Sequence, residues 1–276
     1  MTIDIYIPTG FVFLYGLAIG SFLNVVIYRV PRGKSIVSGG SACPGCGGSI
    51  RWYDNIPLVS YLILRGRCRG CGAPISPRYP AVELLTAAIF SGIFLQLALG
   101  GAPSGGPAAI WTVPWILRLL AYLWFGGALI ACAFIDAEHR IIPNRIVFPT
   151  FLIGLVLLLA ADYHAWSGMF LGVLAGGGIP LLLLLLSPLL LKRQGMGMGD
   201  VKLGATMGLF LGWQLVLLAI FFASLAGSFY NLPKMFGGAE KRRQAFPFGP
   251  FLAIGALAAF FIGTPLITWY LGLFNF

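Results

Sequence analysis

Charged residues are scarce in this sequence. Of its 276 residues, 9% are Asp, Glu, Lys or Arg and 59% are hydrophobic, whereas soluble domains carry about 25% charged residues. A soluble fold of this length could not bury so much apolar surface, so the lipid bilayer must surround most of the chain. Lys and Arg are also missing from the first ten residues. We therefore expect no cleavable signal peptide and interpret the apolar run from Phe11 to Val30 as a retained first span.

Negative charge is scarcer than positive charge. Eight acidic residues oppose eighteen Lys and Arg, which gives a formal net charge of +10. In a soluble protein this balance would suggest nucleic-acid binding, but here the basic residues interrupt apolar runs. All of them except Arg118 lie in the segments 29–78, 140–145, 192–202 and 234–243. Positively charged loops of membrane proteins face the cytoplasm, so the pattern predicts a membrane topology and no nucleic-acid partner.

The apolar runs predict an all-α polytopic membrane protein with about eight transmembrane helices. The expected spans are 10–28, 81–99, 115–135, 147–161, 166–191, 201–211, 214–231 and 249–273. The positive charges then place the N-terminus outside and four loops in the cytoplasm. These loops are 29–80, 136–146, 192–200 and 232–248.

The sixth segment, 201–211, is too short to cross a hydrocarbon core of about 30 Å. The dipeptide Gly212-Trp213 marks a break after it. The alternative is one long kinked helix over 201–231, which would give seven spans.

Two carboxylates occupy positions where charge is costly. Asp136 follows the span 115–135 and Asp200 precedes the segment 201–211, so both are expected at the cytoplasmic rim of the membrane. Ionisable residues at membrane-embedded positions indicate function. Two carboxylates at one depth can share a proton and hold a water, one acting as general base while the other polarises a peptide carbonyl. We therefore predict Asp136 and Asp200 as the catalytic pair of an aspartic endopeptidase.

A glycine-rich segment, Gly195-Met-Gly-Met-Gly, precedes Asp200. Glycine has no Cβ, so Gly197 and Gly199 would let the backbone approach an extended peptide, and we expect them and Lys202 to lie near the substrate. The alternative is a flexible loop in which Asp200 merely caps a helix. Lys202 would either hold Asp200 ionised or extend to the membrane surface.

Other interpretations of the acidic residues stay open. Asp136 could be a simple interface charge, and Glu138 and His139 are expected to be solvated loop residues. The carboxylates could also bind ions or protons in a transporter. Their placement at one face of the membrane, and the absence of an internal repeat, favour the peptidase.

Cysteine is also rare, with five in the chain. Four of them form two C-x2-C pairs separated by 21 residues: Cys43, Cys46, Cys68 and Cys71. Four thiolates suit tetrahedral zinc, and the reducing cytoplasm disfavours disulfides. A closed four-cysteine site leaves no open position for catalysis, so we predict a structural zinc that stabilises the loop 29–80. The fifth, Cys132, is expected in the core of a span.

Several motifs of the chain are similar to those of the bacterial prepilin peptidases, also called type IV leader peptidases. In addition to the cysteine pairs, they are GSFLNVVIYRVP at 20–31, RWYDNIP at 51–57, SYL at 60–62, ISPRYPAVELL at 75–85, GMGDVK at 197–202 and PFGPFL at 247–252. They occur in the expected order along nearly the whole chain. One departure is Asn144, where the family often has Asp.

The resemblance implies a GxGD-type aspartic endopeptidase of the bacterial inner membrane, with Asp136 and Asp200 as its catalytic residues. Its substrates would be type IV prepilins or type II secretion pseudopilins, cut after a glycine at the cytoplasmic boundary of an apolar segment. It also implies N-methylation of the new N-terminal residue with S-adenosylmethionine, an activity associated with the first cytoplasmic loop and left without assigned residues. The expected parts are a first helix (1–28), a zinc-binding loop (29–80) and an embedded peptidase domain (81–276). Membrane lipids would hold the basic loop.

Overall fold

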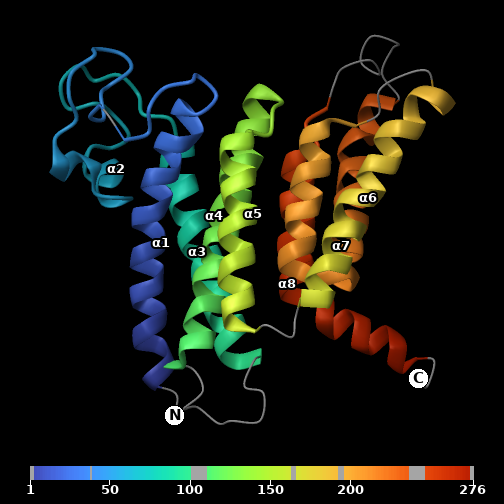
Figure 1. Cartoon of the computed structure of the whole chain (residues 1–276). Coiled ribbons are helices and arrows are strands. Elements are labelled where there is room, and N and C mark those ends of the chain that lie inside the picture. Colours follow the sequence, from blue (N-terminus) through green and yellow to red (C-terminus); the bar gives the residue numbers. More distant parts are fainter. Residues whose placement is uncertain are drawn as a thin grey trace. The chain divides into compact units, whose positions relative to one another are not determined.

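The computed structural model describes residues 3–37, 39–100, 111–162, 166–191, 196–235 and 246–273. Within these residues the regular structure is helical, and the strand-like pairing consists of two isolated bridges. The elements are α1 (Ile3–Arg29), η1 (Trp52–Asn55), α2 (Val59–Ile63), α3 (Arg78–Gly100), α4 (Val113–His139), α5 (Asn144–Ala161), α6 (Trp166–Leu191), α7 (Met198–Met235) and α8 (Gly249–Gly272). The all-α expectation is confirmed (Figure 1).

Seven of these helices are long and apolar enough to cross a membrane. They are α1, α3, α4, α5, α6, α7 and α8. A helix satisfies its own backbone hydrogen bonds, which is why apolar runs of this length are helical in lipid. The chain divides into two compact units, Met1–Ile110 and Trp111–Phe276.

In the first unit, α1 and α3 pack through small residues. A Cβ added at Gly16 would lie 2.6 Å from the Cα of Ala87, and one added at Gly20 would lie 2.6 Å from the Cα of Glu83. Larger side chains at these two glycines would therefore separate the helices. This packing joins the middle and the C-terminal half of α1 to the N-terminal half of α3.

In the second unit, α6 crosses the first half of α7 at very close range. A Cβ at Gly208 would collide with the carbonyl of Gly172, and a Cβ at Gly204 would collide with that of Gly176. The paired residue numbers run in opposite directions, so the two segments are antiparallel. Glycine at all four positions permits backbone contact, the arrangement typical of small-xxx-small helix pairs in membranes.

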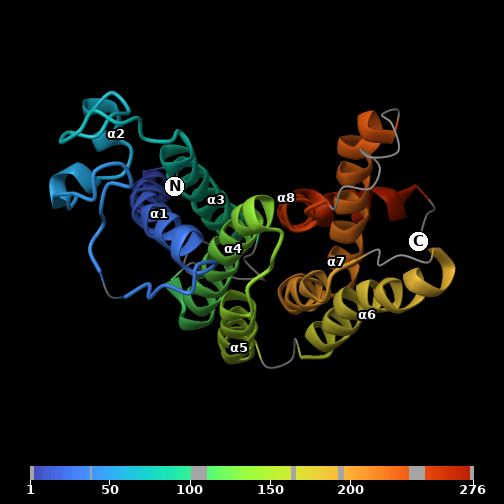
Figure 2. The same ribbon diagram turned by 90° about the horizontal axis from the view of Figure 1, so that it is seen from above.

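The helix α7 is broken at Gly212, whose backbone is not helical (φ 73°, ψ 175°). Gly204 and Val216 both contact Gly176, yet twelve residues of straight helix would separate them by about 18 Å. The chain therefore reverses at Gly212, and the two halves of α7 lie side by side in Figures 1 and 2.

The second half of α7 returns antiparallel to α8. Gly255 of α8 contacts Ala219 and Ala223, and Gly263 contacts Leu215. By length and composition the count is seven candidate spans, the lower of the two expected numbers. Within the α7 candidate, however, the backbone break falls at the expected Gly212-Trp213 junction.

The core of the second unit lies around Phe210. The rings of Phe125 and Phe210 stack with their centroids 4.2 Å apart, and the hydroxyl of Tyr122 donates to the Phe210 carbonyl at 2.8 Å. The break at Gly212 interrupts the helical hydrogen-bond ladder just beyond this carbonyl, so the tyrosine supplies a donor there. Cys132 is fully buried in α4, as expected.

Candidate active site

Asp136 lies in the last turn of α4 and is buried, with 5% of its surface exposed. The helix ends at His139 because Arg140 takes a left-handed conformation (φ 56°) while its N–H donates to the Asp136 carbonyl at 2.8 Å. This arrangement places the Asp136 carboxylate at the boundary between a membrane helix and the loop that follows.

The carboxylate of Asp136 caps another helix, α8. The backbone N–H of Gly249, the first residue of α8, donates to Asp136 Oδ2 at 2.8 Å. Phe248 at the N-cap provides no side-chain hydrogen bond, so the aspartate supplies the acceptor that this helix start needs. The positive end of the helix dipole also favours a negative group there.

Gly249 was not identified as a site residue from the sequence. A Cβ at this position would lie 2.8 Å from Asp136 Oδ2, so close approach of the backbone requires glycine. In the sequence, Gly249 stands between Phe248 and Pro250 at the start of an apolar run. This pattern predicts the start of a helix, but it does not indicate which carboxylate caps that helix.

Asp200 is the third residue of α7 and is also buried, with 9% of its surface exposed. Its Oδ2 accepts the N–H of Gly197 at 3.0 Å, while its own N–H donates to the Gly197 carbonyl at 3.1 Å. This reciprocal pair resembles a capping box at the helix start. The helix-capping role considered for Asp200 therefore exists in the structure.

The chain segments that carry the two carboxylates meet at one end of the second unit. Next to Asp200, Gly199 abuts the side chain of Ile142, where an added Cβ would lie 2.9 Å from the Ile142 Cβ. Since Ile142 belongs to the loop just after Asp136, the two chain segments are in direct contact.

The two carboxylates are held in the same way. In each, Oδ2 accepts a backbone N–H from a glycine, Gly249 for Asp136 and Gly197 for Asp200. Within the described residues no hydrogen bond to either Oδ1 is found. One oxygen of each group thus fixes its orientation and the other can bind a water or a peptide group.

Lys202 contacts α5 and not Asp200. Its Nζ donates to Asn144 Oδ1 at 3.1 Å and lies 5.4 Å from the centre of the Phe148 ring. In the described part of the chain no ion pair joins Lys202 to Asp200. Asn144, the position that departs from the family pattern, is therefore the partner of Lys202.

Glu138 is exposed, as expected, but it lies in the last turn of α4 and not in a loop. His139 is half-buried, and its Nε2 lies 4.0 Å from Glu138 Oε2. The expected full solvation of His139 is thus met only in part, because the residue still belongs to the last turn of α4.

The four paired cysteines of the first unit form one cluster. Their sulfur atoms all lie within 4.8 Å of one another, and the Sγ atoms of Cys43 and Cys71 are 3.9 Å apart. Four ligands at about 2.3 Å from a tetrahedral zinc would lie at similar spacings. None of the cysteines forms a disulfide, so the donor set fits a zinc ion.

The two knuckles repeat the same local structure. Cys43 N–H donates to the Gly48 carbonyl and Gly47 N–H donates to the Cys43 carbonyl, both at 2.9 Å. Cys68, Gly72 and Ala73 repeat these bonds. The pKa of the Cys43 thiol is lowered to about 6, chiefly because the backbone N–H groups of Cys46 and Gly45 stabilise its thiolate. The thiolate is the form that binds zinc.

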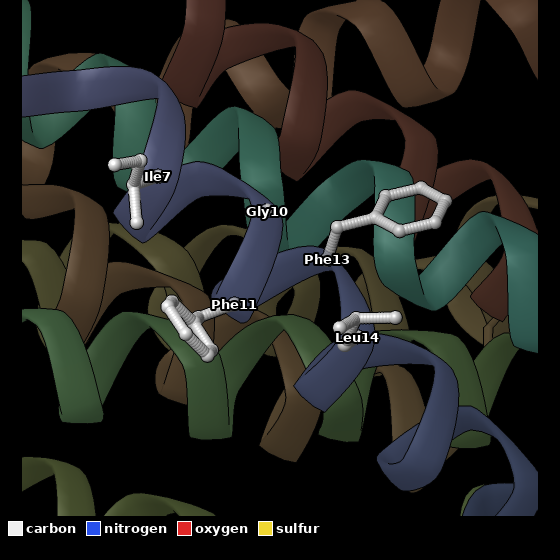
Figure 3. Close-up of a pocket in the computed structure, with 5 residues that line it drawn as sticks. All are labelled: Ile7, Gly10, Phe11, Phe13 and Leu14. Carbon is white, nitrogen blue, oxygen red and sulfur yellow. The ribbon is translucent and has the colours of Figure 1, made fainter. Parts of the chain in front are cut away.

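A surface hollow of the first unit is purely apolar. It has a volume of about 410 Å³ and is lined by Ile7, Gly10, Phe11, Phe13 and Leu14. All five belong to α1 and none has a polar side chain, as Figure 3 shows. This hollow is a lipid-facing part of the first span and carries no chemistry.

Comparison with known proteins identifies the family. The model of the bacterial peptidase A24 N-terminal domain matches residues 14–97, and that of the type IV leader peptidase family matches residues 123–232. The chain belongs to the type IV leader peptidase family. The expected family is confirmed. No solved structure gives a significant match.

Curated relatives are similar over most of the chain. A prepilin leader peptidase/N-methyltransferase of Aeromonas hydrophila is 34% identical over 284 residues, covering 94% of this chain and 92% of the relative. One from Legionella pneumophila is 33% identical over 285 residues, covering 94% and 93%. One from Myxococcus xanthus (strain DK1622) is 40% identical over 218 residues, covering 79% of this chain and 60% of the relative.

The family matches follow the division of the structure. The N-terminal match lies inside the first unit and contains all four paired cysteines. The leader peptidase match lies inside the second unit and contains both Asp136 and Asp200. In this family member, the candidate metal centre and the candidate catalytic pair therefore belong to separate compact units.

Proposed function

We propose that this chain removes the leader from type IV prepilins or type II secretion pseudopilins with Asp136 and Asp200, and then methylates the new N-terminal residue. The observation that supports the catalytic pair is the shared burial and capping of the two carboxylates at one end of the second unit. The names of the relatives support the two activities.

The peptidase step uses one water and one shared proton. One aspartate, ionised, accepts a proton from the water as its oxygen attacks the scissile carbonyl carbon. The other, protonated, donates a hydrogen bond to the carbonyl oxygen. As the C–N bond breaks, a proton passes to the leaving amine, and no covalent enzyme intermediate forms.

The glycine contacts serve this chemistry by holding the aspartates. Each carboxylate keeps one oxygen bound to a backbone N–H, so its orientation does not have to be established during the reaction. Gly199 lies beside Asp200, and because it has no Cβ the Ile142 side chain packs directly against it. This contact keeps the segments that carry the two aspartates together.

The reaction takes place at the cytoplasmic face of the bacterial inner membrane in this proposal. Arg140, Arg145 and Lys202 are close in sequence to the two aspartates. Basic residues next to membrane spans favour the cytoplasmic side. The bilayer would orient the apolar segment of the substrate so that its boundary glycine reaches the aspartates.

The cofactors have separate roles. Zinc would be held by Cys43, Cys46, Cys68 and Cys71 and would stabilise the loop between α1 and α3. S-adenosylmethionine would supply the methyl group for the new N-terminal amine that cleavage releases.

The test is mass spectrometry of a prepilin co-expressed with the chain. The wild type is expected to yield a product cut after the boundary glycine and heavier by one methyl group. A double variant, Asp136→Asn with Asp200→Asn, is expected to leave the prepilin whole. Asp162→Asn is a matched control because this half-exposed carboxylate pairs with Arg118 at the other end of α5. If the double variant still removed the leader at the wild-type level, aspartic chemistry at this site would be excluded.

A further inference from the structure

We propose that residues 52–63 of the first unit, comprising η1 and α2, form a foot that inserts into the interface between lipid headgroups and acyl chains. The partner of this foot is a bilayer containing anionic lipid. The segment has no long apolar run, so it is not a candidate span. Its role is independent of the peptidase chemistry proposed above.

The foot lies alongside the membrane-spanning part of α1. A hollow of about 300 Å³ is lined by Asn55 and Pro57 of the foot together with Ala18, Ser21, Phe22 and Val25 of α1. These α1 residues precede the helix end at Arg29 by four to eleven positions. At 1.5 Å per residue, the foot therefore reaches about 6 to 16 Å along the span from its end.

A hydrogen bond to α3 independently places the foot at a similar distance along a membrane span. The N–H of Leu58 donates to Glu83 Oε2 at 2.8 Å. Glu83 is the sixth residue of α3 and is buried, so this contact lies about 7 Å beyond the start of that span. Leu58 has a positive φ (59°) with a ψ of −49°, a backbone conformation that the bond to Glu83 helps to hold in place.

The face of the foot that does not pack on the unit is apolar. Trp52 is 81% exposed and Leu62 is 73% exposed, and Val59 and Ile63 are also exposed. The polar residue of α2, Ser60, instead points inward and donates to the Tyr53 carbonyl at 2.9 Å. An exposed apolar face beside a membrane span is unfavourable in water and favourable at the lipid interface, where tryptophan is enriched.

Arginines flank this apolar face. Arg51, Arg65 and Arg67 are exposed next to the foot in the sequence, and their charge complements anionic headgroups. Arg69 has a different task, since its guanidinium binds both oxygens of Asp54 at 2.7 to 3.1 Å. This pair ties η1 to the second cysteine knuckle, so the foot would anchor the zinc-binding loop to the membrane.

A lipid partner fits these observations better than a protein partner. The foot is continuous with the surfaces of α1 and α3, which are spans themselves, and Figure 1 draws α2 beside one end of α1. A site at this depth along two spans meets lipid before it meets a soluble protein. The combination of exposed apolar side chains and arginines also matches interfacial segments.

The experiment measures the depth of the foot in the full chain. The protein is reconstituted in nanodiscs of phosphatidylcholine with one quarter phosphatidylglycerol, and a nitroxide-bearing non-natural amino acid replaces Leu62. Val37, 91% exposed in the same loop and outside the foot, takes the label in the control. Collisions with oxygen report lipid, and collisions with a polar nickel chelate report water.

At Leu62, the ratio of nickel to oxygen collisions is expected to be at least about 5-fold lower than at Val37, because the label would lie among acyl chains. A label at Ile63 provides a second position if the Leu62 variant does not fold. Equal ratios at the foot and at Val37 would overturn the proposal. Low collision rates with both reagents would indicate a protein covering the foot, which also contradicts it. Leader cleavage is not a readout, so failure of the proposed function leaves this test valid.

Discussion

The two units hold their chemical groups in different ways. In the first unit, four thiols come from two short knuckles with matching backbone hydrogen bonds, and each knuckle places its own pair. In the second, Asp136 and Asp200 lie on separate helices and each is oriented by a glycine N–H. The metal centre is therefore a product of local structure, whereas the carboxylate pair depends on the packing of α4, α7 and α8.

This difference predicts which substitutions each site tolerates. A local knuckle can form wherever its six or so residues are kept, and the metal then joins two such pieces. A pair assembled from distant helices is sensitive to changes that touch neither carboxylate directly, because sub-ångström shifts of a helix alter the geometry between reacting groups. Substitutions in the two units can test this contrast.

The largest effect is expected from the aspartates themselves. Asp200→Asn and Asp136→Asn should each reduce the rate of prepilin cleavage at least about 100-fold, since an amide cannot take a proton from water. The amide oxygen can still accept the glycine N–H, so thermal unfolding should change little. Rates are measured on purified protein in detergent with a prepilin substrate. A single variant that keeps a tenth or more of the wild-type rate would remove that residue from the mechanism.

The next effect concerns the glycine that holds Asp136. Gly249→Ala places a Cβ 2.8 Å from Asp136 Oδ2, so the carboxylate must move, and the cleavage rate should fall about 10- to 100-fold. The control is Gly178→Ala in α6, where an added Cβ meets nothing within 4 Å. The control should keep the wild-type rate. If both variants cleave equally well, the orientation of Asp136 by α8 is not needed for the reaction.

Gly249 also shows where sequence reasoning reached its limit. Both aspartates could be proposed from the sequence because charge at the edge of an apolar run is rare. The cysteines could be proposed as metal ligands because their pairs are close in the sequence. The cap from Gly249 to Asp136 joins residues 113 positions apart, and no local pattern encodes that pairing.

The same limit applies to shorter features of the fold. The spans follow from apolar runs of 18 residues or more, but η1 and α2 have only four and five residues and lie inside the loop between α1 and α3. The contact of Lys202 with Asn144 was likewise not predicted, since it depends on the way α5 packs beside α7. In each case the missing information was a tertiary contact.

A smaller effect on cleavage is expected from the cysteine cluster. Cys43→Ser removes one of four zinc ligands and should lower the bound zinc, measured by atomic emission, to below about one tenth, because the remaining three thiolates no longer close the site. The loop should then be cut faster by added trypsin. The cleavage rate should fall by less than about 10-fold, since the aspartates belong to the other unit.

A matched serine variant makes the test specific. Cys132→Ser changes a fully buried thiol in α4 that lies outside the cluster, so it should leave zinc content unchanged. Were Cys43→Ser to reduce cleavage as strongly as Asp200→Asn while the protein remains folded, the separation of the two sites would be wrong.

The smallest effect is expected at the contact between α5 and α7. Asn144→Asp would replace the hydrogen bond to Lys202 Nζ with an ion pair at a similar distance. Exposed ion pairs contribute about 0 to 1 kcal/mol, so the melting temperature should rise by a few degrees at most and the gain should shrink in high salt. Lys202→Met in the same background should abolish the gain. A large loss of cleavage in Asn144→Asp would instead indicate that the added charge reaches the aspartate pair, and the catalytic site would then extend to α5.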